Sequence, residues 1–320
     1  MRIVITGGAG FIGSSLAKFH LERGDSVIAF DSLISGGKQS LATISEHPHF
    51  CLVEQDICRP TPELREAIAS ADRVYHMAAI LGQHVVLRDP IGTLSQNIAS
   101  CETVLRIMDE EKSKARLAIA SSSAVYFGEL FATEEALLTI PSGEWKQQPY
   151  RLSKIINEVM ALSYVHEKGI FCVIPRLSNI TGIGQNTPKG IIMPHWIKKA
   201  IKGEPLQVYG TGQQLRTFCN VRDIVQGLHL LLETDRANGE IVNLGSEEEI
   251  SLIDLARKIK ALCNSHSRIE LIPYKQAYGI EYTEIMRARP NLAKLEKLTG
   301  FRPAVKLEET LKEMVDSYAL

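Results

Sequence analysis

The N-terminal stretch constrains the fold of this chain more than any other part of the sequence. A short apolar run at 2–6 leads into a glycine-rich turn at 7–13, and apolar residues then recur at helical spacing up to about Gly24. A second apolar run at 26–30 ends on Asp31. This order predicts a buried strand, a tight turn, a helix and a second strand with an acidic residue at its end.

Each part of this unit suits the binding of a dinucleotide. Gly7, Gly10 and Gly13 let the backbone turn tightly and approach a pyrophosphate, which sits at the positive end of the following helix. An acid about twenty residues further on accepts hydrogen bonds from an adenosine ribose. Glycines alone also occur in ordinary turns, but here the strand, the helix and the acid all stand in the required order. Because the carboxylate of Asp31 would repel a 2′-phosphate and no arginine follows directly, the sequence favours NAD over NADP.

Composition and charge are those of an ordinary globular protein. The 320 residues are 45 % hydrophobic and 23 % charged, with a net charge of −1, which gives no general attraction to nucleic acid or to an anionic membrane. No apolar run approaches the roughly 18 residues of a membrane span, and the N-terminus lacks a signal-peptide pattern. Six cysteines are scattered without CxxC pairs. We therefore expect a cytoplasmic protein with reduced thiols and no metal site.

Strand and helix patterns alternate as far as residue 178. This alternation predicts an α/β fold with a doubly wound parallel (Rossmann) sheet and with ligands at the carboxyl ends of its strands. We expect residues 1–178, with a return segment at about 223–248, to form the dinucleotide-binding domain. Residues 179–222 and 249–320 should form a smaller C-terminal α/β lobe for the substrate. Predicted helices include 62–70, 91–111, 150–168, 193–201, 223–234, 252–262, 290–298 and 307–318.

Tyr150 and Lys154 form a candidate general acid/base pair. They lie four residues apart on a predicted helix, so both side chains leave the same face. A free tyrosine has a pKa of about 10 and is a poor base, but a neighbouring ammonium lowers that pKa by about one to three units. The YxxxK pattern is common by chance. Here it follows a dinucleotide motif and a serine cluster at 121–123, which can hold the hydroxyl that the phenolate deprotonates.

Taken in order, these motifs resemble those of the extended short-chain dehydrogenase/reductases that act on nucleotide sugars. The resemblance covers nearly the whole chain. It implies NAD that is held tightly and recycled, a catalytic Ser/Tyr/Lys set, a nucleotide diphosphate gripped by the C-terminal lobe, and a homodimer formed through the helices near 91–111 and 150–168. The matching segments are the glycine turn with Asp31, 56–57, 76–79, Asn97, 121–126, 150–154, 175–179, 208–212, 216–218, Asp223 and 290–300.

The resemblance also implies roles for single residues. The catalytic set falls on Ser122, Tyr150 and Lys154. Cofactor contacts fall on Gly7, Gly10, Phe11, Ile12, Gly13, Asp31, Ser32, Asp56, Ile57, Ala78, Ala79, Asn97, Tyr150 and Lys154. Substrate contacts fall on Ser123, Asn179, Arg216, Arg287 and Arg289. Arg216 suits a phosphate because guanidinium binds phosphate bidentately, although a solvated surface arginine is the alternative.

Two alanines guide the choice among the family's reactions. In all branches the tyrosine removes the proton of the sugar 4-hydroxyl while the C4 hydride moves to NAD, giving a 4-keto sugar. Dehydratases typically add Asp-Glu beside the serine, and glucuronate decarboxylases typically add a Glu there and an arginine shortly before Pro-Asp. The sequence at 145–154, at 182–185 and from 272 onward most resembles the decarboxylases. Yet Ala124 stands where their glutamate is expected, and Ala288 stands where their arginine is expected.

An alanine cannot move a proton, so we favour an NAD-dependent 4-epimerase that uses a UDP-hexose or a UDP-hexuronate. One alternative is a UDP-glucuronate decarboxylase with rearranged groups, and another is a sugar-nucleotide oxidoreductase that releases its reduced cofactor. A catalytically silent NAD-binding regulatory protein is a further alternative, against which the intact Ser122, Tyr150 and Lys154 argue. The expected partner is a nucleotide-diphosphate sugar, with no nucleic acid and no membrane.

Overall fold

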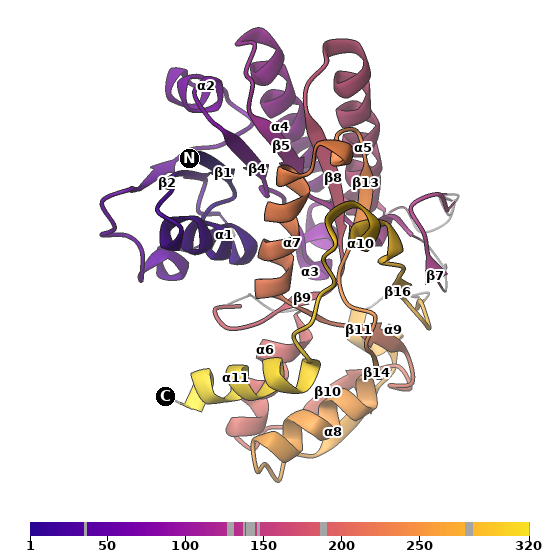
Figure 1. Cartoon of the computed structure of the whole chain (residues 1–320). Coiled ribbons are helices and arrows are strands. Elements are labelled where there is room, and N and C mark those ends of the chain that lie inside the picture. The colour runs from indigo at the N-terminus through magenta and orange to yellow at the C-terminus, as the bar shows by residue number, and fades with distance from the viewer. Residues whose placement is uncertain are drawn as a thin grey trace.

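The computed structural model describes residues 1–34, 37–126, 131–136, 138, 145, 148–185, 191–278 and 284–319. Figure 1 shows a larger part, in which helices flank a central sheet, and a smaller lobe below it that carries the C-terminus. Among the residues in these ranges, no helix has the length and apolar character needed to cross a membrane.

A sheet of eight strands forms the centre of the larger part. Its main path is parallel throughout, as the pairing of Ile3 with Val27 on one side and with Arg73 on the other illustrates. The order along this path is β13 (Ile241–Leu244), β8 (Cys172–Leu177), β5 (Arg116–Ile119), β4 (Arg73–His76), β1 (Arg2–Thr6), β2 (Ser26–Asp31) and β3 (Phe50–Glu54), and β6 (Ser121–Ser122) pairs with β8. The predicted doubly wound sheet is confirmed.

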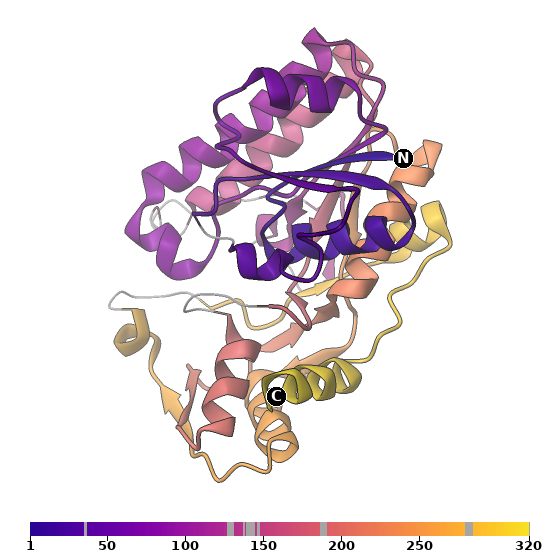
Figure 2. The same cartoon turned by 90° about the vertical axis from the view of Figure 1, so that its left-hand side faces the viewer.

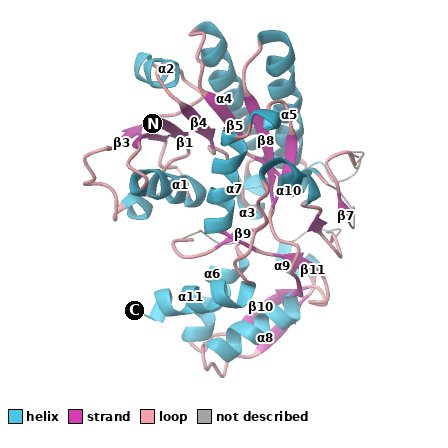
Figure 3. Ribbon diagram, in the orientation of Figure 1, coloured by secondary structure: helices cyan, strands magenta, loops and turns pink. Residues whose placement is uncertain are grey.

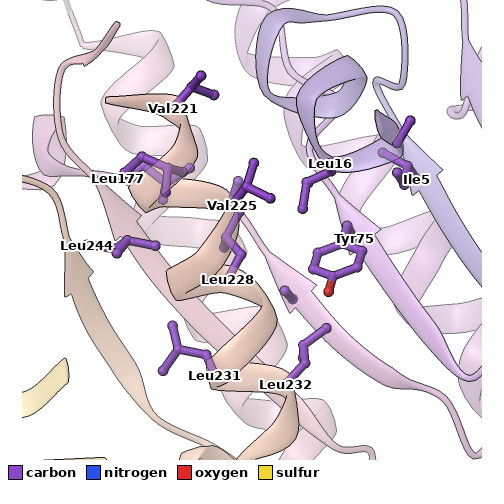
Figure 4. Close-up of a cluster of buried hydrophobic side chains, with 14 of the residues drawn as sticks. Ile5, Leu16, Tyr75, Leu177, Val221, Val225, Leu228, Leu231, Leu232 and Leu244 are labelled. Atoms are coloured by element: carbon purple, nitrogen blue, oxygen red, sulfur yellow. The ribbon is translucent and has the colours of Figure 1, made fainter. Parts of the chain in front are cut away.

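Helices cover both faces of this sheet, because alternate residues of each buried strand point to opposite sides. In β1, Ile3 and Ile5 join the core formed with α1 (Phe11–Glu22) and α7 (Val221–Glu233). Figure 4 shows this core, where Leu16 of α1 lies near Tyr75 of β4 and the leucines of α7. Val4 points the other way, into the core formed with α2 (Pro62–Ala69), α4 (Pro90–Glu110) and α5 (Pro149–Lys168).

The chain leaves the sheet after β8 and returns to it through α7 and β13. In Figure 3, α7 crosses in front of the sheet beside α1. Strand β13 pairs in parallel with β8 and is the edge strand on that side of the sheet. This return supports the division that we propose, with residues 223–248 belonging to the dinucleotide-binding part.

The smaller lobe has a core of its own. Trp196, Leu255 and Leu311 are buried there together, and they come from α6 (Ile192–Ile201), α8 (Leu252–Leu262) and α11 (Leu307–Ala319). In Figure 2 these helices gather below the sheet. The short strands are β7 (Phe131–Ala132), β9 (Ile180–Thr181), β10 (Leu206–Tyr209), β11 (Leu215–Thr217), β12 (Cys219–Asn220), β14 (Glu249–Ser251), β15 (Ile269–Ile272) and β16 (Arg289–Pro290).

Some elements differ from the sequence prediction. The helix expected at 290–298 starts later, as α10 (Ala293–Thr299), because Arg289 and Pro290 pair with β7 as strand β16. Two short helices, α3 (Gln83–Arg88) and α9 (Tyr274–Tyr278), and most of the short strands of the lobe were not predicted.

Candidate active site

The glycine turn between β1 and α1 is shaped for close approach. The amides of Gly7 and Gly8 both donate to the Phe30 carbonyl, at 2.7 and 3.2 Å. A Cβ on Gly13 would lie 2.1 Å from the Gly7 oxygen, so only glycine fits where the helix meets the turn. A Cβ on Gly10 would lie 3.1 Å from the Gly7 oxygen. The turn therefore forms a cradle that fits a pyrophosphate at the N-terminus of α1.

Asp31 is buried and fixed at the end of β2. Its Oδ2 atom accepts from the Ala9 amide at 2.9 Å, and its Oδ1 atom accepts from the Leu33 amide at 2.8 Å. The carboxylate thus ties the glycine turn to the loop after β2, in the place where it can meet an adenosine ribose. Ser32, next in the chain, is exposed.

The other predicted cofactor residues lie along the same carboxyl edge of the sheet. Phe11 and Ile12 form the first turn of α1, and Ala78 and Ala79 follow β4; all four are partly buried. A Cβ on Gly7 would lie 2.7 Å from the Ala78 amide nitrogen, so the two segments are in contact.

The remaining three predicted cofactor residues have protein partners or lie inside the core. Asp56 accepts from the Cys58 amide at 3.0 Å, and the Ile57 side chain is part of the core. The amide group of Asn97 accepts from the Ile80 nitrogen at 2.7 Å and donates to the Ile80 oxygen at 3.0 Å. Asn97 therefore fixes the loop after β4, which we expect to form a wall of the cofactor site.

Ser122, Tyr150 and Lys154 come together where β6 meets α5. The Lys154 ammonium nitrogen lies 5.8 Å from the centroid of the Tyr150 ring and donates to the Ala120 oxygen at 2.7 Å. The Tyr150 hydroxyl is hydrogen-bonded to Ser122. Ser122 also accepts from the Ala124 amide at 3.1 Å, which caps the short turn that begins at Ser123.

Burial determines the pKa values of this set. Removal from water lowers the pKa of Lys154 to about 8, although nearby Cys101 and Glu158 oppose the shift. Burial raises the pKa of Tyr150, and the hydrogen bond with Ser122 opposes that shift. This direction corrects the sequence-based expectation that Lys154 alone would bring the pKa of Tyr150 down. Desolvation outweighs the hydrogen bond with Ser122.

A buried ion pair supports the set from behind. The Arg176 guanidinium binds both carboxylate oxygens of Glu158, with Nε–Oε1 at 2.8 Å and Nη2–Oε2 at 2.7 Å. The Ser121 hydroxyl donates to Glu158 at 2.5 Å, and Arg176 donates to the Tyr126 hydroxyl at 2.7 Å. These bonds join α5, β6 and β8, so they hold Ser122 and Tyr150 on a common support.

A cavity of about 240 Å³ opens beside Ser122. None of the described residues that line it is Asp or Glu. Ala124 and Ala288, the two positions at which the family resemblance implies additional catalytic groups in the other branches, both line it. The lining residues are Ser122, Ser123, Ala124, Tyr126, Ala132, Leu177, Ser178, Asn179, Arg216, Thr217, Ile285, Ala288, Arg289 and Pro290.

The three predicted phosphate-binding arginines differ in position. Arg216 and Arg289 line the cavity, and Arg287 is not among its lining residues. The Arg287 guanidinium instead binds both oxygens of Glu249, at 2.6 Å each. The structure thus brings Arg216 and Arg289 to the same cavity as Ser123 and directs Arg287 to a carboxylate of β14.

Sequence reasoning missed two hydroxyls at this cavity. Ser178 and Thr217 line it, and their side-chain oxygens are buried without a hydrogen-bond partner among the described residues. A buried hydroxyl without a partner carries a free-energy penalty that a polar ligand can remove. Ser178 and Thr217 are direct sequence neighbours of the predicted substrate-binding residues Asn179 and Arg216. This adjacency was the sequence signal that could have identified them.

Known proteins are similar to this chain in sequence and in fold. Residues 3–245 match the family described as the NAD dependent epimerase/dehydratase family. The UDP-N-acetyl-alpha-D-glucosaminuronate decarboxylase of Bacillus cytotoxicus is 31 % identical over 317 residues, which cover 98 % of this chain and 96 % of that protein. The UDP-glucuronic acid decarboxylase 1 of Danio rerio is 30 % identical over 319 residues, which cover 99 % of this chain and 72 % of that protein.

A solved structure gives the same result for the fold. A double mutant of the dTDP-glucose 4,6-dehydratase DesIV from Streptomyces venezuelae, determined with NAD bound, matches with a TM-score of 0.88 at 25 % identity. The match covers 100 % of this chain and 97 % of that one. The resemblance inferred from the motifs and the prediction of NAD as cofactor are confirmed by these matches.

Proposed function

Since the chain belongs to the NAD dependent epimerase/dehydratase family, we propose that it is a nucleotide-sugar 4-epimerase acting on a UDP-hexose or a UDP-hexuronate. One observation carries this proposal. The cavity beside Ser122 is lined by hydroxyls, an amide and arginines, and none of its described lining residues is a carboxylate. Dehydration needs an additional acid and base at this place, whereas epimerisation needs only the Ser122, Tyr150 and Lys154 set.

The cofactor is held by the glycine cradle, Asp31 and the loop after β4. Bound there, NAD supplies the chemistry of hydride acceptance and return. Asp31 binds the adenosine ribose hydroxyls, and Lys154, whose ammonium lies beside the Tyr150 ring, keeps a positive charge next to the reacting hydroxyl. Asn97 contributes by holding the wall loop through Ile80.

Proton transfer belongs to Tyr150. Its phenolate oxygen takes the proton of the sugar 4-hydroxyl as the C4–H bond breaks, and a 4-keto sugar results. Ser122 holds the 4-hydroxyl by a hydrogen bond, and the Lys154 ammonium stabilises the phenolate. After the keto sugar turns over, Tyr150 returns the proton to the new 4-hydroxyl, so the reaction consumes no net proton or electron.

The diphosphate and the sugar occupy the cavity between the sheet and the smaller lobe. Asn179 and Arg216 bind the phosphates, and Arg289 adds positive charge at the same cavity. The unpartnered hydroxyls of Ser178 and Thr217 bind polar groups of the substrate, and Ser123 lies beside them.

Decarboxylation of a UDP-hexuronate is the second candidate, and the names of the two relatives favour it. In that reaction the same 4-keto sugar would lose its carboxylate as CO₂. Against it stand Ala124 and Ala288 at the cavity wall, where that branch of the family typically carries its additional glutamate and arginine.

Product analysis separates the two reactions. Purified protein with NAD is incubated with UDP-glucuronate, UDP-glucose and UDP-N-acetylglucosamine, and the products are followed by NMR while CO₂ is measured. We expect the 4-epimer of one of these sugars and no CO₂. Stoichiometric CO₂ from UDP-glucuronate would overturn the epimerase proposal in favour of the decarboxylase. The Tyr150→Phe variant serves as the control for enzyme-dependent conversion.

A further inference from the structure

Arg216 has a protein partner at the cavity where we propose the diphosphate binds. Its Nη1 atom donates to the Leu215 oxygen at 2.8 Å, and its Nη2 atom donates to a carboxylate oxygen of Glu284 in an ion pair. A guanidinium has five N–H donors, so these two bonds leave donors for a further anion. The side chains of Arg216 and Glu284 are 17 % and 15 % exposed, which shields their pairing from water.

Glu284 is itself anchored by a second element of the lobe. Its other carboxylate oxygen accepts from the Tyr274 hydroxyl at 2.5 Å. The Gln214 amide donates to that same hydroxyl and to the Tyr209 oxygen, at 2.9 Å each. A chain of hydrogen bonds therefore runs from the end of β10, through Gln214, Tyr274 and Glu284, to the guanidinium of Arg216.

Gly210 makes room for this series of hydrogen bonds. Its φ is +70°, in the left-handed region that favours glycine. A Cβ there would lie 2.5 Å from the Tyr274 ring, so the ring rests directly on the backbone of Gly210. The loop after β10 is thus built to receive Tyr274, and through it to fix the position of Glu284.

We propose that Glu284, anchored by Tyr274, is a positioning residue that holds the Arg216 guanidinium ready for the substrate diphosphate. This inference rests on the proposed function of the site. An unrestrained arginine loses rotamer freedom when it is fixed, and a side chain that is already fixed before binding avoids part of that loss. Glu284 does not touch the sugar or the reacting atoms in this proposal.

The negative charge of Glu284 has an opposing effect on substrate affinity. A carboxylate beside the guanidinium repels an incoming diphosphate, so an ion pair of this kind can either orient Arg216 or compete for it. Two substitutions separate these effects. Glu284→Ala removes both the charge and the hydrogen bonds, whereas Glu284→Gln removes the charge and keeps an amide oxygen that can accept from Arg216.

The test measures UDP binding to the NAD-loaded protein by titration calorimetry. If Glu284 positions Arg216, we expect Glu284→Ala to weaken UDP binding about tenfold or more, as for loss of a hydrogen bond to a charged group. Glu284→Gln should bind UDP at least as tightly as the wild type, and Tyr274→Phe should weaken binding less than Glu284→Ala does. With the nucleotide sugar as substrate, Glu284→Ala should raise KM and leave kcat nearly unchanged.

The matched control is Glu309→Ala, because Glu309 also pairs with an arginine, Arg222 at 2.8 Å, and Arg222, unlike Arg216, is not among the described residues that line the cavity. It should leave UDP affinity and KM unchanged. Equal or tighter UDP binding by Glu284→Ala would overturn the positioning role and leave the proposed function intact. Absence of UDP binding by the wild type would instead overturn the proposed nucleotide-sugar site, and the role of Glu284 with it.

Discussion

Tyr150 is the residue on which the proposed chemistry depends. It is hydrogen-bonded to Ser122, and the Lys154 ammonium lies 5.8 Å from its ring centroid. Replacing Tyr150 by Phe removes the proton acceptor and little of the packing. We expect kcat to fall about 10²- to 10⁴-fold, with NAD retained at wild-type stoichiometry, as measured by steady-state kinetics and by release of the cofactor on denaturation.

Tyr164→Phe is the matched control for that variant. Tyr164 lies on the same helix, α5, and is not among the cavity-lining residues. Its substitution should leave kcat unchanged. Wild-type turnover by Tyr150→Phe would show that another group accepts the proton.

Because of Lys154 we expect kcat/KM to depend on pH in the alkaline range. In the proposed mechanism its ammonium stabilises the Tyr150 phenolate, and burial lowers the pKa of Lys154 to about 8. As the pH rises through about 8 the ammonium is lost, so kcat/KM should fall on the alkaline side. Lys154→Met should lower kcat/KM at pH 7 and remove that alkaline decrease in a pH–rate profile. An alkaline decrease that persists unchanged in Lys154→Met would assign it to a different group.

At the scale of single residues, the spacing of Tyr150 and Lys154 on one helix face was enough to predict their proximity. The direction of the pKa shift of Tyr150 was not predictable, because it depends on burial by segments far away in the sequence. Glu284 and Tyr274 were missed for a similar reason. Their connection to Arg216 exists only after three separate segments of the lobe have come together.

At the scale of elements, the Glu158–Arg176 pair holds α5 to β8 in the interior. Both side chains are nearly inaccessible, at 4 % and 3 % exposure. Glu158→Ala would leave the Arg176 charge buried and unpaired, so we expect the free energy of unfolding to fall by about 3–5 kcal/mol. Urea unfolding followed by circular dichroism measures this loss.

Glu167→Ala is the control for that measurement, because Glu167 is an exposed residue near the end of the same helix. It should change the unfolding free energy by less than about 0.5 kcal/mol. A similarly small change for Glu158→Ala would mean that the buried pair contributes little to the attachment of α5.

Local signals predicted the long elements well and the short ones poorly. α5, α7 and the main sheet strands have enough apolar residues at the right period to be recognised. The later start of α10 was not predictable, because Pro290 is drawn into a pairing with β7, more than 150 residues earlier in the chain. The two- to four-residue strands of the lobe likewise depend on tertiary pairing rather than on their own sequence.

At the scale of the whole molecule, two buried histidines link stability to pH. His20 bonds to Asp25 at 2.7 Å and to the Tyr75 hydroxyl at 3.0 Å, and His229, Arg23 and the N-terminal ammonium complete its charged surroundings. Burial lowers the pKa of His20 in spite of Asp25, and burial lowers the pKa of His76, which bonds to Thr6, to about 3.

Both groups bind protons more readily in the unfolded chain than in the folded one. Their contribution to stability is therefore present above their unfolded pKa of about 6.5 and is lost as the pH falls below it. We expect the free energy of unfolding to decrease between pH 7.5 and pH 5.5 by up to about 1.4 kcal/mol per pH unit for each histidine. Urea unfolding at several pH values measures this slope, and His20→Gln should reduce it; stability that is constant over this range would contradict the assignment.

The helices α4 and α5 present apolar side chains that fit the homodimer expected from the family resemblance. Ile91 and Val159 are 81 % and 61 % exposed. If these helices form the dimer interface, Val159→Glu should convert the dimer to a monomer in light scattering, with the circular dichroism spectrum unchanged. A wild-type protein that is monomeric at all concentrations would contradict this interface. The substitution Lys18→Glu on α1 is the surface control and should leave the dimer intact.

The way Asp31 is held has a consequence for attempts to redesign the coenzyme. Its two oxygens accept from the Ala9 and Leu33 amides, so the residue that we expect to discriminate against a 2′-phosphate also holds the backbone of the glycine turn in place. Replacing Asp31 alone, in order to admit NADP, would remove both hydrogen bonds and loosen the glycine turn that we expect to bind either coenzyme. Laboratory evolution toward NADP should therefore recover Asp31 replacements only together with second changes that restore acceptors for those two amides.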